Sequence, residues 1–303
     1  MAEQLPSSVD DLAASLREHA YLADRGLATV LHLSVVLEKP LLLEGEAGVG
    51  KTELAKVLAE LSGARLIRLQ CYEGIDVAHA LYDWSYSRQL LYIRTLEAGE
   101  AQDARETLHE LFSREFLERR PLLDAIEHDD AIPPVLLIDE IDRADDEFEA
   151  YLLEVLSDYQ ITVPELGRFT ATRSPIVVLT SNRTRDVHDA LKRRCLYHWV
   201  EHPGFAREVA IVRLRVPHVI EPLARQVAAA VESLRSLNLY KPPGVAETID
   251  WAQALAALGV STIDERSVDA TLGTVLKYRE DQERARQNGL ADLVAQATAR
   301  AVA

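Results

Sequence analysis

One short stretch constrains this chain more than any other part of it. The sequence GEAGVGKT, from Gly45 to Thr52, satisfies the pattern G-x-x-x-x-G-K-[ST] and follows soon after the apolar residues 41–43. A short apolar run that leads into glycines is typical of a strand covered on both faces. The sequence therefore predicts a buried strand, a glycine-rich loop, and a helix from Thr52 to about Leu61.

The glycine-rich loop has the chemistry of a cradle for nucleotide phosphates. Glycines let consecutive backbone N–H groups turn toward one anion, and the N-terminus of the following helix adds partial positive charge. Lys51 can reach the outer phosphates, and the Thr52 hydroxyl can bind Mg²⁺. A tight turn with a surface lysine is the plainer alternative, but the flanking strand and helix favour the cradle. We therefore expect the nucleotide to contact Gly45, Glu46, Ala47, Gly48, Val49, Gly50, Lys51 and Thr52.

Two later strand ends carry polar residues that suit hydrolysis. The apolar residues 135–138 end in Asp139 and Glu140. Asp139 is placed to hold Mg²⁺, and Glu140 is placed to orient and polarise an attacking water. Many strands end in acids that only face solvent, but an acidic pair downstream of a phosphate loop favours catalysis. Asn182, after the apolar residues 176–180, could position the same water or could simply hold a turn.

The order of apolar runs predicts an α/β fold. Strand candidates alternate with helical patterns, which indicates a mainly parallel sheet. The candidates are residues 41–43, 65–69, 135–138, 176–180 and 196–200, with two helices before the first of them. Residues 72–132 are too long for a plain crossover and are expected to form an insertion with a helix over 97–126. Residues 159–172 are expected to form a β-hairpin.

The strand signals stop after Pro203 and Gly204. Helical patterns follow over residues 205–216, 220–237, 245–258, 266–286 and 290–301. We therefore expect a nucleotide-binding domain over residues 1–204 and an all-helical domain over residues 205–303.

Composition excludes several classes of protein. No run of eighteen apolar residues occurs, so no integral membrane segment is expected. The N-terminal sequence resembles neither a secretory signal nor a transit peptide, which favours the cytoplasm. The net charge of −16 opposes the basic surface that nucleic acid requires, so nucleic acid is not an expected partner. The one concentrated candidate for a local basic surface is the cluster at residues 192–194. A lone charge cluster of this kind is usually a solvated face.

The two cysteines, Cys71 and Cys195, are too few and too far apart for a disulfide framework or a paired zinc site. Both are expected to be reduced core thiols. Cys195 and His198 are expected on the last strand, where their spacing places them on opposite faces. We therefore expect the chain to bind Mg²⁺ and no transition metal.

Taken in order, these features resemble the AAA+ ATPases and specifically the MoxR family. The phosphate loop, the Asp-Glu strand, the Asn-tipped strand, a basic motif and a helical tail follow one another along nearly the whole chain. Residues 139–144, DEIDRA, are similar to the family's Asp-Glu-Ile-Asn-Arg-Ala signature, with Asp142 in place of the more usual Asn. Residues 70–74 (QCYEG), 80–84 (ALYDW) and 191–199 (LKRRCLYHW) are similar to the CoxD-type branch. Members of that branch assist maturation of the molybdenum- and copper-containing carbon monoxide dehydrogenase.

The resemblance implies a three-layer αβα sandwich of the P-loop NTPase type, with a parallel five-stranded sheet in the order 5-1-4-3-2 and a C-terminal all-α lid. It also implies rings, commonly hexamers, with ATP bound between subunits. Arg194, with Arg193 as the alternate, is similar to the arginine that enters the next subunit's site. Arg266, at the start of a lid helix, would contact the γ-phosphate within its own subunit, unless it is only solvated. The insertion near residue 72 and the hairpin match the family's helix-2 and pre-sensor-1 inserts.

For function, the resemblance implies an ATP-hydrolysing chaperone that remodels a client protein. The implied client is a metalloenzyme awaiting its metal centre, and the implied partner carries a von Willebrand factor A domain. Two other functions stay open at this point. One is a motor acting on nucleic acid, which the acidic balance disfavours. The other is a non-hydrolysing nucleotide-dependent scaffold, which the presence of Glu140, Asn182 and Arg194 disfavours.

Overall fold

A computed structural model describes residues 5–97 and 104–302. Contacts between residues divide the chain into two units, which are described separately. The first unit holds Arg25–Glu44 and Leu54–His198, together with the residues up to Ser15. The second unit holds the chain from Trp199 onward, together with Leu16–Asp24 and Gly45–Glu53. A domain boundary at residue 204 stays a prediction.

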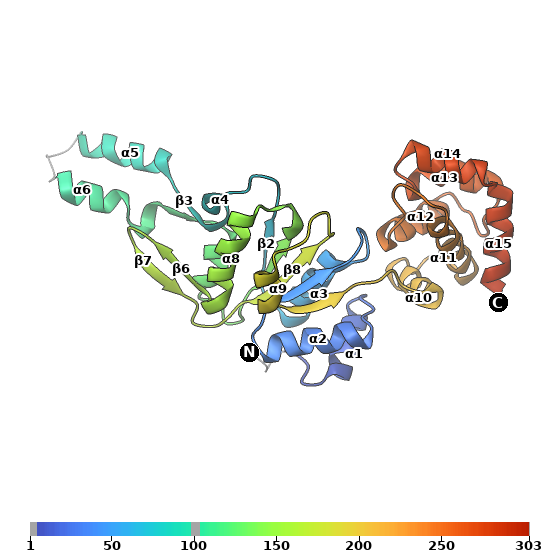
Figure 1. Ribbon diagram of the computed structural model, residues 1–303, viewed down its shortest axis with the longest axis horizontal. Helices are drawn as coiled ribbons and strands as arrows, with labels where there is room; N and C mark the ends of the chain where they lie inside the picture. The colour runs from blue at the N-terminus through green and yellow to red at the C-terminus, as the bar shows by residue number, and fades with distance from the viewer. Residues whose placement is uncertain (1–4, 98–103, 303) are drawn as a thin grey trace. The chain divides into compact units, whose positions relative to one another are not determined.

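The first unit is built on a five-stranded sheet with the order β2-β5-β8-β1-β9. Its strands are β1 (Leu41–Glu44), β2 (Leu66–Gln70), β5 (Val135–Asp139), β8 (Ile176–Ser181) and β9 (Leu196–Trp199). The pairs β1–β8, β5–β8 and β2–β5 are parallel (Figure 1). The predicted strands are therefore confirmed. Numbered along the chain from one to five, the strands of this sheet have the order 2-3-4-1-5, which is the predicted order 5-1-4-3-2 listed from the opposite edge.

Burial explains why these strands are continuous apolar runs. Every residue of β1, β5 and β8 is buried, as expected for central strands of a parallel sheet. In β2, at the sheet edge, Ile67 and Leu69 are buried while Arg68 and Gln70 are exposed. Because the strands are parallel, the residues that follow β5 and β8 lie at the same edge of the sheet.

Helices complete the first unit. Those that precede β2 are α1 (Val9–Glu18), α2 (Arg25–Val36) and α3 (Lys51–Ser62). The end of α1 and the start of α3 lie in segments assigned to the second unit. Those after β5 are α8 (Asp146–Asp158) and α9 (Asp189–Arg194). Apolar side chains of α8, including Phe148 and Leu152, belong to the core of the sheet. The helix expected after the glycine-rich loop is confirmed.

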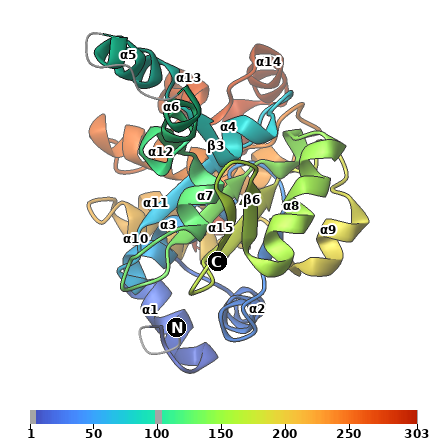
Figure 2. The same ribbon diagram turned by 90° about the vertical axis from the view of Figure 1, so that its left-hand side faces the viewer.

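The insertion differs from the prediction, because a single helix over residues 97–126 is wrong. The described part of the insertion contains α4 (Val77–Leu81), β3 (Tyr82–Trp84), α5 (Tyr86–Glu97), α6 (Ala104–Leu111), β4 (Leu117–Arg119) and α7 (Pro121–Ile126). Residues 98–103 of the predicted helix lie outside the described residues. The β3 and β4 strands pair antiparallel, and α5 and α6 lie side by side (Figures 1 and 2).

A small apolar cluster explains why the insertion folds back on itself. Trp84 packs edge to face on Phe112, with ring centroids 5.1 Å apart, and Phe116 is buried beside them. Pro121 then starts α7, since a proline fits the first turn of a helix but not its interior. These contacts join residues far apart in sequence, so helical periodicity alone did not reveal them.

The predicted hairpin is present as β6 (Gln160–Val163) and β7 (Gly167–Thr170), which pair antiparallel. Ile161, Val163 and Phe169 are buried in the core of the sheet, while the intervening strand residues are mostly exposed. Gly167 has a φ of +85°, a conformation that favours glycine, at the turn. Alternating burial therefore accounts for the alternating sequence of this segment.

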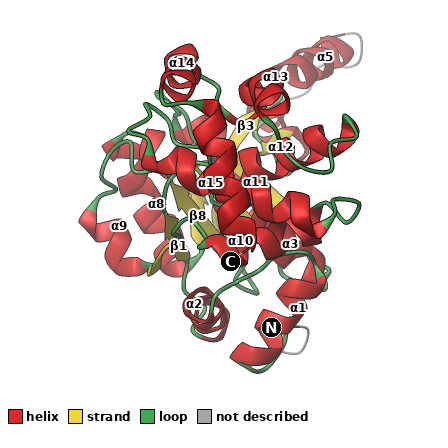
Figure 3. Ribbon diagram, turned by 90° about the vertical axis from the view of Figure 1, so that its right-hand side faces the viewer, coloured by secondary structure: helices red, strands yellow, loops and turns green. Residues whose placement is uncertain are grey.

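From residue 205 the second unit is helical (Figure 3), as predicted. Its helices are α10 (Phe205–Arg215), α11 (Glu221–Ser236), α12 (Val245–Ala257), α13 (Glu265–Val275), α14 (Arg279–Gln287) and α15 (Leu290–Val302). A single helix over 266–286 is wrong, because the chain turns between α13 and α14. The turn lets buried Asp281 accept hydrogen bonds from Tyr240 N and Lys241 N, at 2.7 and 3.0 Å.

A buried ion pair ties three of these helices together. Glu208 of α10 is 1% exposed and accepts two hydrogen bonds from Arg235 of α11, at 2.7 and 2.8 Å. The Thr248 hydroxyl of α12 donates to the same carboxylate at 2.6 Å. Each charge is therefore paired and hydrogen-bonded, as buried charges require. None of the described helices combines the length and the apolar character needed to cross a bilayer.

Candidate functional site

The phosphate loop, residues 45–52, has the backbone that its sequence requires. Gly48 and Gly50 have φ values of +78° and +97°, which favour glycine. A Cβ atom at Gly45 would lie 2.4 Å from the backbone oxygen of Val200. All three glycines of the motif are therefore needed for this loop conformation.

Lys51 places a positive charge inside the phosphate loop. The side chain is buried, and its Nζ donates hydrogen bonds to the backbone oxygens of Gly45 and Glu46, at 2.8 and 2.7 Å. Lys51 also starts α3, so its ammonium group and the helix N-terminus lie close together. This combination of a cation and a helix N-terminus attracts anions.

Two further side chains support the phosphate loop. The Tyr21 hydroxyl donates to the backbone oxygen of Gly50 at 3.3 Å. Burial raises the pKa of Tyr21, so this phenol remains a hydrogen-bond donor. His202 Nε2 lies 2.9 Å from Glu46 Oε2. Neither Tyr21 nor His202 follows from the loop motif itself.

The N-terminus of α12 contacts the phosphate loop. The backbone oxygen of Gly48 accepts hydrogen bonds from Val245 N and Ala246 N, at 3.0 and 3.3 Å. A Cβ at Gly244 would lie 2.8 Å from both the backbone oxygen of Ala47 and the Cα of Gly48. Glycine at position 244 therefore permits this close approach of two backbones.

Arg266 lies elsewhere in the second unit. It is exposed in the first turn of α13, beside a hollow that Asp269 and Arg286 also line. Its expected contact with the γ-phosphate stays a prediction. The contacts described above between the phosphate loop and the C-terminal helices involve the N-terminus of α12.

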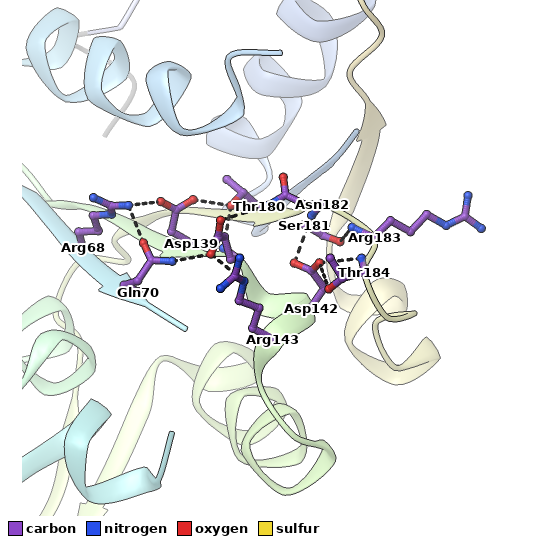
Figure 4. A network of polar contacts seen from close by, with 11 residues as sticks. Arg68, Gln70, Asp139, Asp142, Arg143, Thr180, Ser181, Asn182, Arg183 and Thr184 are labelled. Carbon is purple, nitrogen blue, oxygen red and sulfur yellow. Dashed lines mark hydrogen bonds and ion pairs between the residues drawn. The ribbon is translucent and has the colours of Figure 1, made fainter. Parts of the chain in front are cut away.

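Asp139, Glu140 and the side chains that contact them form an acidic cluster at the end of β5, in the first unit (Figure 4). This cluster is named the acidic half. Asp139 is 2% exposed. Its Oδ1 accepts a hydrogen bond from Thr180 Oγ1 and its Oδ2 from Arg68 Nη2, both at 2.6 Å. Asp139 is thus held by side chains from the strands on both sides of β5.

Glu140 has a left-handed backbone conformation, with φ 57° and ψ 51°. This conformation is uncommon for residues other than glycine, and it is often found at functional sites. The Glu140 backbone N–H donates to Thr180 Oγ1 at 2.9 Å. The Thr180 hydroxyl therefore fixes Asp139 and the backbone of Glu140 together.

The Glu140 carboxylate is surrounded by donors. Its Oε1 accepts a hydrogen bond from Asn182 Nδ2 at 3.2 Å, so the structure brings these two predicted residues together. Its Oε2 accepts from Gln70 Nε2 at 3.0 Å and forms an ion pair with Arg143 Nε at 3.0 Å. A water beside Glu140 and Asn182 would meet an acceptor and a donor in one place.

Asp142 orders the loop that follows β8. It is 3% exposed, and its Oδ1 accepts a hydrogen bond from Asn182 N at 3.1 Å. Its Oδ2 accepts from Thr184 N at 2.8 Å and from Thr184 Oγ1 at 2.7 Å (Figure 4). Asp142 therefore positions Asn182 through its backbone, a role that the sequence did not reveal.

Five contributors to the acidic half were missed from the sequence: Arg68, Gln70, Arg143, Thr180 and Thr184. Arg68 and Gln70 alternate with buried residues on β2, which gave a faint signal that both face the same side. The register that pairs Gln70 with Asp139 places them at the site, and it becomes visible only in the structure.

Arg193 and Arg194 are the last residues of α9, and both are exposed. Arg194 Nη1 donates to Ser157 Oγ at 2.7 Å. Both arginines are thus at the surface of the first unit, and the action of either one across a subunit interface stays a prediction.

The cysteines are buried free thiols, as predicted. Burial raises the pKa of each thiol to about 12, and nearby Asp139 and Asp142 contribute further at Cys71. Cys195 immediately precedes β9, so its placement on that strand was wrong by one residue.

The fold and the site together define a class of protein. A parallel sheet whose first strand leads into a phosphate loop and a helix, and whose third strand along the chain ends in paired carboxylates, is typical of P-loop nucleotide-binding proteins. The sequence profile of the ATPase family associated with various cellular activities (AAA) matches residues 41–200. The chain belongs to this family.

Solved structures give weaker similarities. A point mutant of RuvB from Thermotoga maritima shares 16% identity at a TM-score of 0.48, with 98% of this chain and 90% of that chain covered. An ATPase structure from Cytophaga hutchinsonii shares 12% identity at a TM-score of 0.43, with 96% and 92% covered. The Thermotoga maritima RuvB Holliday junction branch migration motor shares 14% identity at a TM-score of 0.43, with 98% and 89% covered. No curated protein matches the sequence.

Proposed function

We propose that this chain is an ATPase that binds ATP and Mg²⁺ at the phosphate loop and hydrolyses ATP with Glu140 and Asn182. The observation that carries the proposal is the hydrogen bond between these two side chains, beside a buried Asp139. A site for binding alone would not need a carboxylate and an amide directed at one another at the strand tips.

The residues present fit a magnesium-bound triphosphate. Lys51 supplies a buried cation within the loop, and α3 supplies a helix N-terminus. Thr52 and Asp139 supply hard oxygen ligands, which Mg²⁺ prefers. When bound, Mg²⁺ would neutralise charge on the phosphate oxygens. Asp139 is almost fully buried, so its charge acts in a region of low dielectric.

Each chain residue then has a defined task in hydrolysis. Glu140 polarises the attacking water, and Asn182 orients that water by donating or accepting a hydrogen bond. Lys51 holds the outer phosphates. Arg194 or Arg193 of a neighbouring subunit would stabilise the charge that spreads over the γ-phosphoryl oxygens. Arg266 would contact the same group from its own subunit.

For the biological role, we extend the proposal to a chaperone of the MoxR type. In this proposal the chain assembles into a ring, commonly hexameric, in the cytoplasm. A partner with a von Willebrand factor A domain and a metalloenzyme client, such as a molybdenum–copper carbon monoxide dehydrogenase, follow from the sequence resemblance. The α5–α6 segment and the β6–β7 hairpin are the inserts expected to reach the client.

Three variants test the proposed chemistry. Lys51→Ala should abolish ATP binding measured by calorimetry, since it removes the loop cation. Glu140→Gln should bind ATP but lower kcat by about 10²- to 10⁴-fold, the usual contribution of a general base. Glu165→Gln, an exposed acid in the hairpin turn, is the matched control and should retain wild-type turnover.

The outcomes separate the candidate functions. Tight ATP binding by Lys51→Ala would contradict the phosphate-loop assignment. Wild-type turnover by Glu140→Gln would remove Glu140 from its role, and no turnover by the wild-type chain, with or without a partner, would favour a scaffold. A strong rise in turnover on adding DNA or RNA would favour a nucleic-acid motor, which the net charge of −16 makes unexpected.

A further inference from the structure

Arg68 makes a contact that the proposed reaction does not use. Its Nη2 lies 2.6 Å from Asp139 Oδ2 and 2.5 Å from Gln70 Oε1. The contact follows from strand register, because Gln70 pairs with Asp139 across β2 and β5, and Arg68 lies two residues earlier on the same face. A positive side chain therefore occupies one oxygen of the carboxylate expected to hold Mg²⁺.

The two partners of this ion pair differ in freedom. The Asp139 side chain is 3% exposed and is also held by Thr180, so it cannot follow a moving partner. The Arg68 side chain is 50% exposed and extends from an edge strand on a long flexible stem. Arg68 can therefore swing into solvent without disturbing the apolar core.

Charge makes a shared site unfavourable. A divalent cation bound through Asp139 would meet the guanidinium within a few ångströms, in a region where Asp139 is almost excluded from water. A buried carboxylate without a cation is also costly. The guanidinium and a divalent cation are therefore not both favoured at Asp139 Oδ2.

We propose that Arg68 and Mg²⁺ compete for Asp139, so that Arg68 balances the carboxylate until the metal arrives with the nucleotide and displaces it. This inference rests on the proposed function, because it takes Asp139 as a magnesium-binding residue. It makes Arg68 a positioning residue that sets the magnesium concentration at which the site fills.

The test is the magnesium dependence of ADP binding, which needs no turnover. The dissociation constant of a fluorescent ADP analogue is measured by anisotropy over a series of Mg²⁺ concentrations, using the full chain. Arg68→Gln should lower the half-saturating Mg²⁺ concentration by about fivefold, the scale of a partly exposed ion pair. Arg68→Lys, which keeps the charge, should stay near the wild-type value.

A matched control and a second readout exclude a merely structural role. Arg65→Gln removes a nearby arginine that pairs with Asp124 and Asp130 instead, and it should not change the magnesium dependence. The melting temperature provides the second readout, measured with ADP present. Arg68→Gln should melt lower than wild type in EDTA and recover on adding Mg²⁺, because the metal then replaces the missing cation.

Two results would overturn the inference while leaving the proposed function intact. One is an unchanged or raised magnesium requirement in Arg68→Gln, with ADP still bound. The other is a melting temperature lowered equally with and without Mg²⁺. If the wild-type chain binds no nucleotide at any Mg²⁺ concentration, the proposed function fails and this inference fails with it.

Discussion

Asp142 offers the sharpest test of how the site is held together. The substitution Asp142→Asn keeps the shape of the side chain and changes its charge and its hydrogen bonding. The carboxylate accepts hydrogen bonds from Asn182 N, Thr184 N and Thr184 Oγ1. Asparagine has one acceptor oxygen, so its amide nitrogen would face a donor on at least one side.

The expected loss follows from these contacts. Asp142 is 3% exposed, so water cannot replace a lost partner. A hydrogen bond to a charged group contributes about 1.5 to 3 kcal/mol. The substitution leaves no cavity, so a loss of packing does not contribute to the change in the free energy of unfolding. We therefore expect the free energy of unfolding of the first unit to fall by about 2 to 3 kcal/mol.

Two measurements check this expectation. Urea unfolding gives the change in the free energy of unfolding, and amide hydrogen exchange reports locally on the backbone of Asn182 and Thr184. Asp186→Asn is the control, because its side chain is 79% exposed and should change stability by under about 0.5 kcal/mol. If Asp142→Asn resembles this control and exchange at the two amides is unchanged, the role assigned to Asp142 is refuted.

Two further predictions concern the thiols and the α12 contact. Because burial raises the pKa of Cys71 and Cys195 to about 12, neither should react with Ellman's reagent at pH 8 in the folded chain, and both should react in urea. Unfolded thiols ionise near pH 8.5, so the free energy of unfolding should fall as pH rises above that value, and Cys71→Ala should reduce the slope. Gly244→Ala should weaken ADP binding by about 5- to 150-fold, since a Cβ there overpacks the phosphate loop at a cost of about 1 to 3 kcal/mol. Gly204→Ala, where a Cβ meets open space, is its control, and equal affinities in the two variants would show that the α12 contact does not shape the loop.

The sequence predicted the parts of this fold that depend on local patterns. Central parallel strands are buried on both faces, so β1, β5 and β8 are continuous apolar runs. The phosphate loop needs glycines at fixed positions, so Gly48 and Gly50 are visible in the sequence. Asn182 was found because it follows a buried strand directly.

The parts that were missed depend on contacts between distant residues. The β3 and β4 strands have three residues each, too short for a periodic pattern, and they exist because Trp84 and Phe116 share an apolar cluster. The break between α13 and α14 follows from buried Asp281, which binds the backbone of residues 240 and 241. No local sequence pattern predicts the short β3–β4 pair or the break between α13 and α14.

The two buried acids of the site show why register carries functional information that a motif does not. Asp142 is satisfied by backbone and hydroxyl groups of a single loop, which cannot leave without unfolding it. Asp139 is satisfied in part by Arg68, a half-exposed cation from an edge strand. One carboxylate is therefore built as a fixed support and the other as an exchangeable ligand, although they lie three residues apart in one motif. The difference comes from the neighbouring strand, because the pairing of β2 with β5 brings Arg68 to the first acid.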